Sequence, residues 1–498
     1  MFVINILFVI CLAITLLYLK WYQMKMFWKK RGISQAQVHP IFGSLTFLQK
    51  INPSDWLLNI YKQYPFPYVG IWVFWRPGLI INSPDIAQNI LVKDADVFRN
   101  RLCGTGKSDD LGSLNLFNAN DPLWTFIRKQ LTAPFTPAKL RNWQNLFHNK
   151  SVDLIGRIKS DNVKGITSNL KYLFADYTTD VIGESAFGIK CEATKNSVGP
   201  LREMTKEIEK FSIFRGIEWS SIFFFPELAD MLRFKFWPRH AGAYFKKLFS
   251  MIVEERGGYD KNTDGNRDLM DVLIKMKQDA KKNNKDIDEV VLVSNALIFL
   301  QGGYDTSSII LTYVIYELAY NTNFQEILYE ELTTLKQENG QFEADDLAKL
   351  PYLNAVLKES LRKYPVIGWM DRVALKDYDV DENLKIPAGT AILVNVHGMH
   401  RDPKYFPEPD EFRPDRFLPE REKDIVPYSY LPFGAGPRFC IGKRFAWHTM
   451  RFALAAIIMN FILKPISTMP VPDKVVFAKN GILTHPGETL SVEFIPRD

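Results

Sequence analysis

The stretch FGAGPRFCIG, residues 433–442, places Cys440 late in a turn that also holds Gly434, Gly436 and Arg438. The apolar run FAWHTMRFALAAIIMNFIL follows almost directly and predicts a buried helix. Glycines permit a tight turn whose amide N–H groups can point at one sulfur atom. A lone cysteine is usually a small buried hydrophobe. The glycines and the arginine around Cys440 favour instead a thiolate that is kept as an anionic ligand, of the kind that binds haem iron.

Length and composition limit the class of protein. The chain has 498 residues, is 47% hydrophobic and contains 36 Phe, so it can bury a large core. A net charge of +6 is mild for this length and argues against a dedicated nucleic-acid binder. The cysteines have no CxxC or CxxCH spacing, so we expect reduced thiols at Cys11, Cys103, Cys191 and Cys440.

The N-terminus predicts a membrane anchor. Residues 2–19, FVINILFVICLAITLLYL, are uncharged and long enough to cross most of a bilayer as a helix. A cleaved signal peptide is disfavoured because no basic residue precedes the run and no small-x-small site follows it. Lysines interleaved with Trp21, Tyr22 and Trp28 come next, which places the bulk of the chain on the cytosolic side. We predict a transmembrane signal anchor over 1–20, a basic and aromatic linker over 21–45, and a catalytic domain over 46–498.

The rest of the chain reads as mostly helical. Alternating segments such as YVGIWVFW and LIINS predict strands of a small sheet, and helical patterns dominate from about Asp85 to Arg372. The longest pattern, residues 287–320, is apolar on all sides and should lie at the centre of the fold. Its Gly302–Gly303 pair costs helix stability and predicts a kink or a close approach. The irregular, Pro-rich segment 401–424 is of a kind that supports a site.

The turn around Cys440 resembles the haem-binding signature of the cytochrome P-450 superfamily, F-G-x-G-x-R-x-C-x-G, with every fixed position matched. The resemblance covers essentially the whole chain, and YTTDVIGESAFGIKC, residues 177–191, is similar to insect microsomal members of the xenobiotic-metabolising clan. It implies a mainly α fold with small β-sheets, preceded by one N-terminal transmembrane helix. One departure concerns the joint between anchor and body, where this chain has only Pro40 and the microsomal pattern has several prolines.

The resemblance also implies how the cofactor, non-covalent haem b, is held. Cys440 is the thiolate ligand of the iron, and the segment WTFIR, residues 124–128, resembles the W-x-x-x-R motif that contacts the haem propionates. Any one of the arginines, taken alone, would more often be a surface charge. Besides Cys440, the implied cofactor-binding residues are Phe433, Gly434, Gly436, Trp124, Arg128, Arg372 and Arg438.

Two further motifs complete the likeness. GGYDT, residues 302–306, resembles the [AG]-G-x-[DE]-T oxygen-activation motif, which implies that Thr306 and Asp305 relay protons during catalysis. Without Cys440 they would be read as ordinary backbone-bonded helix residues, and the motif leaves open whether Tyr304 crowds the pocket.

The segment ESLR resembles E-x-x-R and places Glu359 and Arg362 on one helix face. Such a pair is usually a solvated surface contact. The resemblance adds Arg416 as a third partner and makes the three a buried structural triad with no chemical role.

Substrate and redox partners are expected from outside the motifs. Variable segments at 101–120, 211–237, 366–370 and 481–485 are where the family contacts a lipophilic substrate. The phenylalanines of the second segment could line a channel, dip into the membrane surface, or simply pack in a helix core. No flavin or nicotinamide fingerprint is evident, so electrons should come from a separate NADPH-cytochrome P-450 reductase carrying FAD and FMN, with cytochrome b5 as a second donor. The residues of this chain that would dock an acidic reductase are Lys129, Lys443 and Arg444. The alternative is that they are ordinary solvated surface charges.

The sequence thus predicts a membrane-bound haem-thiolate monooxygenase of the endoplasmic reticulum, with its catalytic domain facing the cytosol. It would insert one oxygen atom from dioxygen into a lipophilic molecule. A haem-thiolate isomerase or dehydratase that needs no reductase is the first alternative, and the intact GGYDT motif argues against it. A non-catalytic haem-binding or lipid-binding membrane protein is the second. The sequence names neither the substrate nor the choice between hormone synthesis and detoxification.

Overall fold

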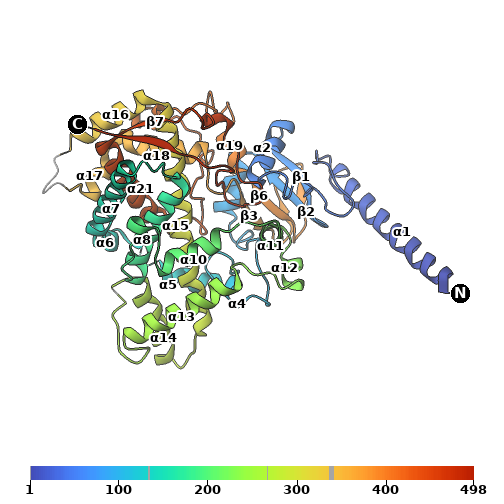
Figure 1. Cartoon of the computed structure of the whole chain (residues 1–498). Coiled ribbons are helices and arrows are strands. Elements are labelled where there is room, and N and C mark those ends of the chain that lie inside the picture. The colour runs from blue at the N-terminus through green and yellow to red at the C-terminus, as the bar shows by residue number, and fades with distance from the viewer. Residues whose placement is uncertain (1, 133–134, 266, 336–340, 498) are drawn as a thin grey trace.

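Helices dominate the computed structural model, which describes residues 2–132, 135–265, 267–335 and 341–497. The main sheet lies to one side of the helical body, as the sequence predicts, whereas the strand pair β7-β8 (Phe461–Pro465 and Val492–Pro496) runs across the helices (Figure 1). Residues 1 and 498, the outer ends of the predicted domains, lie outside the described residues. The helices are α1 Phe2–Lys29, α2 Pro53–Gln63, α3 Pro84–Gln88, α4 Asp110–Ser113, α5 Leu123–Leu131, α6 Pro137–Arg141, α7 Gln144–Val163, α8 Leu170–Phe187, α9 Ala193–Asn196, α10 Pro200–Glu209, α11 Ile213–Phe224, α12 Pro226–Met231, α13 Arg239–Glu255, α14 Leu269–Lys282, α15 Glu289–Tyr320, α16 Thr322–Thr333, α17 Ala344–Lys349, α18 Pro351–Lys363, α19 Val396–His400, α20 Pro419–Glu422 and α21 Lys443–Asn460.

The main sheet has the strand order β1-β2-β6-β3. Strands β1 and β2 form an antiparallel hairpin, β6 adds in parallel to β2, and β3 pairs antiparallel with β6. Two separate strand pairs, β4-β5 and β7-β8, complete the sheets of the described chain. The strands are β1 Tyr68–Val73, β2 Arg76–Ile81, β3 Met370–Val373, β4 Tyr378–Asp379, β5 Lys385–Ile386, β6 Ala391–Val394, β7 Phe461–Pro465 and β8 Val492–Pro496.

Both faces of the main sheet are buried, because successive side chains of a strand point to opposite faces. Ile71 and Ile80 face the large helical core, whereas Trp72 and Leu79 face a second, smaller core. The end of α1 covers part of this second face. The two predicted strand segments are therefore confirmed as β1 and β2, and they are buried on both sides without a solvent-facing stripe.

Helix α1 projects from the body (Figure 1) and continues beyond the predicted anchor. Its residues 4–29 are long and apolar enough to cross a membrane, by length and composition. Residues 21–29, expected in a linker, belong to this helix because its end packs on the main sheet. Trp28 is fully buried and donates from Nε1 to Ile71 O at 3.0 Å, and Trp72 Nε1 donates to Met24 O at 3.0 Å.

Helix α15 runs through the middle of the helical body (Figure 1) and contacts α8, α13, α14, α18 and α21. Asp288 caps it by accepting from Val290 N at 3.0 Å. Most of its residues are buried, as its apolar pattern predicts. The glycine pair has two different roles: a Cβ on Gly303 would lie 2.6 Å from Ile182 of α8, whereas a Cβ on Gly302 would meet nothing within 4 Å. The predicted close approach is thus found at Gly303, and Gly302 faces open space.

Candidate functional site

The turn before α21 is folded around the Cys440 sulfur. Gly434 and Gly436 have φ angles of +77° and +68°, which favour glycine. A Cβ on Gly436 would lie 1.7 Å from the carbonyl oxygen of Leu91, so a side chain does not fit there. The Cys440 amide closes the turn by donating to Phe433 O at 2.9 Å. A backbone hydrogen bond from Gly442 reaches the sulfur.

The surroundings of Cys440 suit a stabilised thiolate. Cys440 keeps accessible surface, so a ligand can reach it, although the surrounding protein atoms lie close enough for burial to act on its thiol. Burial has the largest effect and leaves the pKa of the thiol above its ordinary value, while the Gly442 amide and the charges of Arg128, Lys443 and Arg101 act in the opposite direction and favour the thiolate. Cys191, by contrast, has two carboxylates nearby, and burial together with these charges raises its pKa to about 12. Cys440 differs from Cys191 in having a backbone N–H group bonded to its sulfur and only cations among the charges that act on it.

The open side of α15 bears the predicted oxygen-activation motif. Gly302 and Thr306 keep accessible surface on a helix that is mostly buried. The Thr306 hydroxyl donates to Gly302 O at 2.7 Å. Tyr304 is fully buried, and its carbonyl accepts from Thr178 Oγ1 of α8 at 2.8 Å. Tyr304 therefore lies away from the open side that Gly302 and Thr306 share.

Asp305 has a partner that the sequence did not reveal. His485 Nε2 lies 2.9 Å from Asp305 Oδ1, and both residues are buried. His485 comes from segment 481–485, which the sequence predicts as a substrate-contacting loop. The only signal in the sequence was a histidine in that segment, and nothing local tied it to a helix 180 residues earlier.

Three arginines gather at one buried point, and we call Arg101, Arg372 and Arg438 the arginine cluster. Arg101 Nη1 lies 3.0 Å from Asp371 Oδ1, and Arg372 Nη1 donates to the Asp371 carbonyl at 2.7 Å. Arg438 donates from Nε to Arg99 O at 2.7 Å and from Nη2 to Ala119 O at 3.0 Å. The guanidinium of Arg438 also lies over the Trp124 ring, 4.2 Å from its centroid.

The arginine cluster carries more positive charge than it can compensate. Asp371 is the carboxylate that pairs with it, and Arg438 Nη1 is buried with no hydrogen-bond partner among the described residues. Burial, followed by the charges of Arg101 and Arg372, lowers the pKa of Arg438 to about 9; burial and Arg101 lower that of Arg372 to about 10. Buried cations are costly unless paired. The cluster therefore suits an anionic ligand group.

Arg128 and the arginine cluster belong to the same site as the thiol. Arg128 lies one helical turn after Trp124 on α5, with its guanidinium 4.7 Å from the centroid of the Phe439 ring. The charges of Arg128 and of Arg101 both lower the pKa of Cys440. The predicted residues around the turn are thus brought together. Arg101 was missed, because no short motif marks it.

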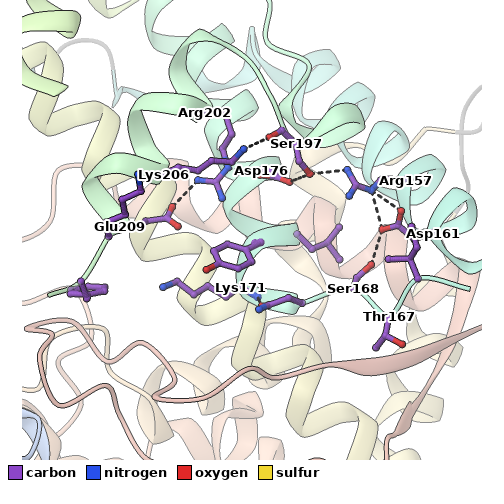
Figure 2. Close-up of a pocket in the computed structure, with 16 residues that line it drawn as sticks. Arg157, Asp161, Thr167, Ser168, Lys171, Asp176, Ser197, Arg202, Lys206 and Glu209 are labelled. Atoms are coloured by element: carbon purple, nitrogen blue, oxygen red, sulfur yellow. Dashed lines mark hydrogen bonds and ion pairs between the residues drawn. The ribbon is translucent and has the colours of Figure 1, made fainter. Parts of the chain in front are cut away.

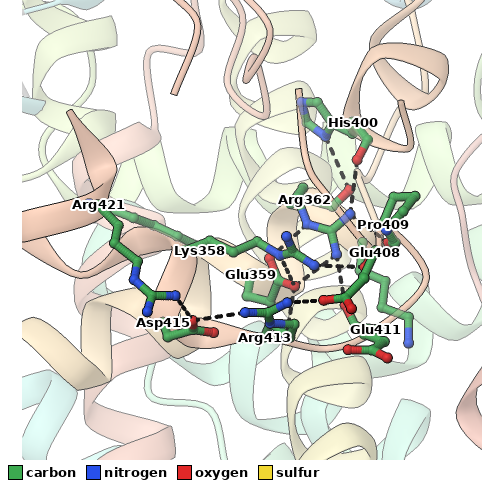
Figure 3. A network of polar contacts seen from close by, with 12 residues as sticks. Lys358, Glu359, Arg362, His400, Glu408, Pro409, Glu411, Arg413, Asp415 and Arg421 are labelled. Carbon is green, nitrogen blue, oxygen red and sulfur yellow. Dashed lines mark hydrogen bonds and ion pairs between the residues drawn. The ribbon is translucent and has the colours of Figure 1, made fainter. Parts of the chain in front are cut away.

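The predicted triad is a closed network behind this site (Figure 3). Glu359 and Arg362 form a bidentate pair at 2.7 and 2.8 Å, with both side chains fully buried, and Arg416 Nε lies 3.4 Å from Glu359 Oε1. The remaining N–H groups of Arg362 donate to the carbonyls of His400, Pro409 and Glu411. Segment 401–424 thus supplies two of the carbonyls that accept from Arg362. We call Glu359, Arg362 and Arg416 the ion triad.

His400 joins the ion triad to the cysteine turn. Its Nε2 accepts from the Leu431 amide at 2.9 Å, and its Nδ1 lies 3.1 Å from Arg362 O. These bonds require a neutral ring that donates from Nδ1. Burial and the Arg362 charge lower the pKa of His400 to about 3, in keeping with this form. The sequence did not single out His400, because its partners lie 31 and 38 residues away.

Comparison with known proteins decides the family. The family model described as Cytochrome P450 matches residues 34–491. The chain belongs to the cytochrome P450 family. Cytochrome P450 6k1 of Blattella germanica is 33% identical over 469 residues, which cover 90% of this chain and 88% of that protein. Cytochrome P450 3A29 of Sus scrofa is 32% identical over 494 residues, covering 98% of this chain and 95% of its own length. The likeness to insect members is confirmed.

This P450 is therefore a monooxygenase, and its family uses a haem-thiolate cofactor. The residues present fit that cofactor on two counts. A cysteine with a directed N–H group and nearby cations suits a thiolate ligand, and an under-compensated arginine cluster suits two carboxylates such as the haem propionates.

Proposed function

We propose that Cys440 is the thiolate ligand of haem b in a membrane-bound monooxygenase that oxidises lipophilic small molecules. The observation that carries this proposal is the accessible Cys440 in a glycine turn, with the Gly442 amide and the charges of Arg128 and Lys443 acting on its thiol. The haem, when bound, supplies the redox chemistry that inserts one atom of dioxygen into the substrate. Phe433, Gly434 and Gly436 hold the cysteine turn in shape.

The arginine cluster would hold the haem propionates. Arg372 and Arg438 are the predicted partners, and Arg101 joins them in this proposal because it shares Asp371 with Arg372. Trp124 supports Arg438 through its ring face, and Arg128 would complete the cationic side of the site next to the sulfur. Planar guanidinium groups bind carboxylates in fixed geometry, so the cluster would set the orientation of the cofactor.

Thr306 and Asp305 would hold and move protons during oxygen activation. The Thr306 hydroxyl, now bonded to Gly302 O, has accessible surface, so it can turn toward a ligand in the open space. Asp305 is buried and adjacent in sequence, and His485 holds one of its oxygens. A hydroxyl beside a positioned carboxylate can deliver a proton into a space that excludes bulk water.

A cluster of buried aromatic rings, contributed by three of the segments expected to contact a substrate, supports the proposal of a lipophilic substrate. Phe223 of α11 lies with its ring centroid 6.1 Å from that of Phe117 and 6.3 Å from that of Trp369. Phe224 stacks on the same Trp369 ring at 5.6 Å. Segments 101–120, 211–237 and 366–370 thus meet, as expected for regions that select a substrate. Oxidation of foreign compounds is the role we propose, because the chain resembles insect P450s of family 6 and mammalian P450s of family 3A.

Membrane attachment would place the enzyme on the endoplasmic reticulum. In the proposed arrangement, residues 1–20 cross the bilayer, 21–45 connect, and 46–498 form the catalytic domain on the cytosolic side. Helices α11 and α12 lie below the main sheet in Figure 1, on the side from which α1 projects. Their large exposed apolar side chains, which would rest on the lipid surface, are Ile213, Phe214, Ile217, Met231 and, after α12, Leu232.

A separate reductase would supply the electrons from NADPH through its FAD and FMN, with cytochrome b5 as a second donor. The acidic surface of the reductase would dock on three exposed cations near the cysteine turn, Lys129, Lys443 and Arg444. Reversing Lys129 and Lys443 to glutamate should weaken the apparent affinity for the reductase. An unchanged affinity would remove these two residues from the docking surface.

The test of the proposed function is reduction by NADPH. Full-length, haem-loaded protein is placed in phospholipid vesicles with an NADPH-cytochrome P450 reductase under carbon monoxide. NADPH should generate the thiolate-type carbon monoxide spectrum, and a sample without reductase should not. A protein that dithionite reduces but NADPH with reductase does not would instead support the reductase-independent isomerase.

A further inference from the structure

His485 connects Asp305 to a second carboxyl, Glu209, at the end of α10. His485 Nε2 lies 2.9 Å from Asp305 Oδ1. The other ring nitrogen, Nδ1, is buried and has no hydrogen-bond partner among the described residues, and the same holds for Glu209 Oε2. Glu209 lies close enough to His485 and Asp305 for their charges to act on it. Three titratable groups from three separate segments thus meet at one place.

Two cavities share Glu209 in their walls. The inner cavity has a volume of about 10 Å³ and is lined by Glu209, Asp305 and His485, among others. A space of this size with several polar groups around it holds one water molecule. The outer cavity has a volume of about 650 Å³, and Glu209 and Phe211 line it as well. Glu209 is therefore the polar group in the wall between the two cavities.

The outer cavity reaches solvent and is lined with charged groups (Figure 2). Tyr172 and Lys210 in its lining are exposed. Arg202 is fully buried, donates from Nη1 to Glu209 Oε1 at 2.8 Å, and has an Nη2 atom without a partner among the described residues. Figure 2 shows Arg202 next to both Glu209 and Asp176, with which it forms ion pairs. Water that enters this cavity can therefore reach the Glu209 carboxyl.

The charges that face Glu209 come from four elements. Burial raises the pKa of its carboxyl, the Arg202 charge on α10 lowers it, and the Asp305 charge on α15 raises it. Lys171 on α8 and His485 lower it further, and the net result is a raised pKa. A carboxyl whose neutral form is favoured by burial can take up a proton and pass it on.

We propose that Glu209 and His485 form a relay that carries protons from the outer cavity to Asp305. The inference rests on the proposed function, because the relay would deliver protons to Asp305, the carboxylate that the proposed function assigns to oxygen activation. Glu209 takes a proton from water in the outer cavity and passes it through one water molecule in the inner cavity to His485 Nδ1. His485 then releases its Nε2 proton to Asp305 Oδ1, so one proton enters the ring and one leaves it. No electron moves along the relay.

Substitutions that keep size and polarity test the relay. Glu209→Gln and His485→Gln each remove a proton carrier, while Glu209→Asp keeps one. The matched control is Glu207→Gln on the same helix, which removes a partly exposed carboxylate paired with Lys210 and His240. Full-length, haem-loaded protein and reductase are reconstituted in phosphatidylcholine vesicles. NADPH oxidation is then followed across pH in H₂O and D₂O.

The two Gln variants should oxidise NADPH about tenfold more slowly or worse, with a larger solvent isotope effect. Glu209→Asp should recover most of the rate, and the Glu207→Gln control should match the wild type. Because Glu209 no longer titrates in Glu209→Gln, the pH profile of this variant should lose one ionisation. Wild-type rates and isotope effects in both Gln variants would overturn the relay.

A second measurement does not depend on turnover. Protein labelled with ¹⁵N-histidine is titrated as its ferrous carbon monoxide complex, and the His485 signal is assigned by its loss in His485→Gln. Because Glu209 and His485 interact, Glu209→Gln should shift the His485 titration while Glu207→Gln leaves it in place. A His485 titration curve that is the same in the wild type and in Glu209→Gln would overturn the relay. Failure of the proposed function is distinguishable from failure of the relay. In that case, NADPH and reductase would not reduce the wild-type protein at all.

Discussion

The ion triad and the arginine cluster are both sets of buried arginines, yet one is closed and the other is open. In the ion triad, a fully buried carboxylate faces two arginines, and backbone carbonyls take the remaining N–H groups of Arg362. In the arginine cluster, one carboxylate serves three guanidiniums, and Arg438 keeps an N–H group without a described partner. A buried network whose hydrogen-bonding groups have partners stabilises a fold. A network that is left short of negative charge binds a ligand.

The largest effect should come from breaking the ion triad. Glu359→Ala leaves two buried arginines without their carboxylate, which should cost about 3–5 kcal/mol of unfolding free energy. Chemical denaturation measures it. The control is Glu422→Ala, which removes an exposed partner of Lys358 and should cost about 1 kcal/mol or less. Equal losses in the two variants would mean that the triad is no more structural than a surface pair.

The second-largest loss of stability should come from adding a side chain at Gly436 in the cysteine turn. Gly436→Ala forces a Cβ against the Leu91 carbonyl, at 1.7 Å in the present geometry, and also strains a positive φ. We expect a loss of about 3 kcal/mol or more, together with loss of haem. Gly389→Ala is the matched control, because its φ of +82° is strained but nothing lies within 4 Å of its Cβ. A Gly436→Ala loss no larger than that of the control would contradict the close contact.

Removing one charge of the arginine cluster should have opposite effects on two quantities. The haem-free protein should keep or gain stability, and the affinity for haem should fall. Arg438→Met removes a poorly compensated buried cation, so haem-free protein should be unchanged or more stable. Haem affinity should fall by about tenfold or more, because a charge-assisted bond to a carboxylate contributes about 1.5–3 kcal/mol. Denaturation of the haem-free form and transfer of haem to apomyoglobin separate the two effects. A variant that destabilises the haem-free protein and leaves haem affinity unchanged would place Arg438 with the ion triad.

The smallest effect near neutral pH is that of His400 titration, which grows only as the solution becomes acidic. The pKa of His400 is about 3 in the folded protein and about 6.5 in an unfolded chain. The unfolded state therefore binds more protons between these values, and the His400 contribution to stability is full above pH 6.5 and lost as pH falls toward 3. His400→Gln keeps a donor and an acceptor but cannot titrate, so its stability should fall less steeply in this window. Parallel curves for the two proteins would contradict a buried neutral His400.

Local patterns account for what the sequence predicted well. Strands β1 and β2, the buried course of α15 and the Glu359–Arg362 pair all follow from periodicity or from a motif a few residues long. The cysteine turn could be predicted for the same reason, because its glycines and its cysteine are contiguous.

What the sequence did not reveal depends on partners far away in the chain. Arg101 meets Asp371 270 residues later, and His485 meets Asp305 across 180 residues. The end of α1 lies beyond the predicted anchor because Trp28 is buried against β1, 43 residues on. Each of these side chains belongs to a common residue type in an ordinary local setting. Only the folded arrangement distinguishes them.

The most direct test of the central claim is the carbon monoxide difference spectrum of the reduced protein, measured for wild type, Cys440→Ser and Cys191→Ser. Cys191 is a buried thiol with carboxylates nearby and serves as the matched control. The account predicts the strongly red-shifted thiolate band in the wild type and in Cys191→Ser, and its loss in Cys440→Ser. A folded, haem-loaded Cys440→Ser protein that keeps the band would contradict the assignment of Cys440 as the iron ligand.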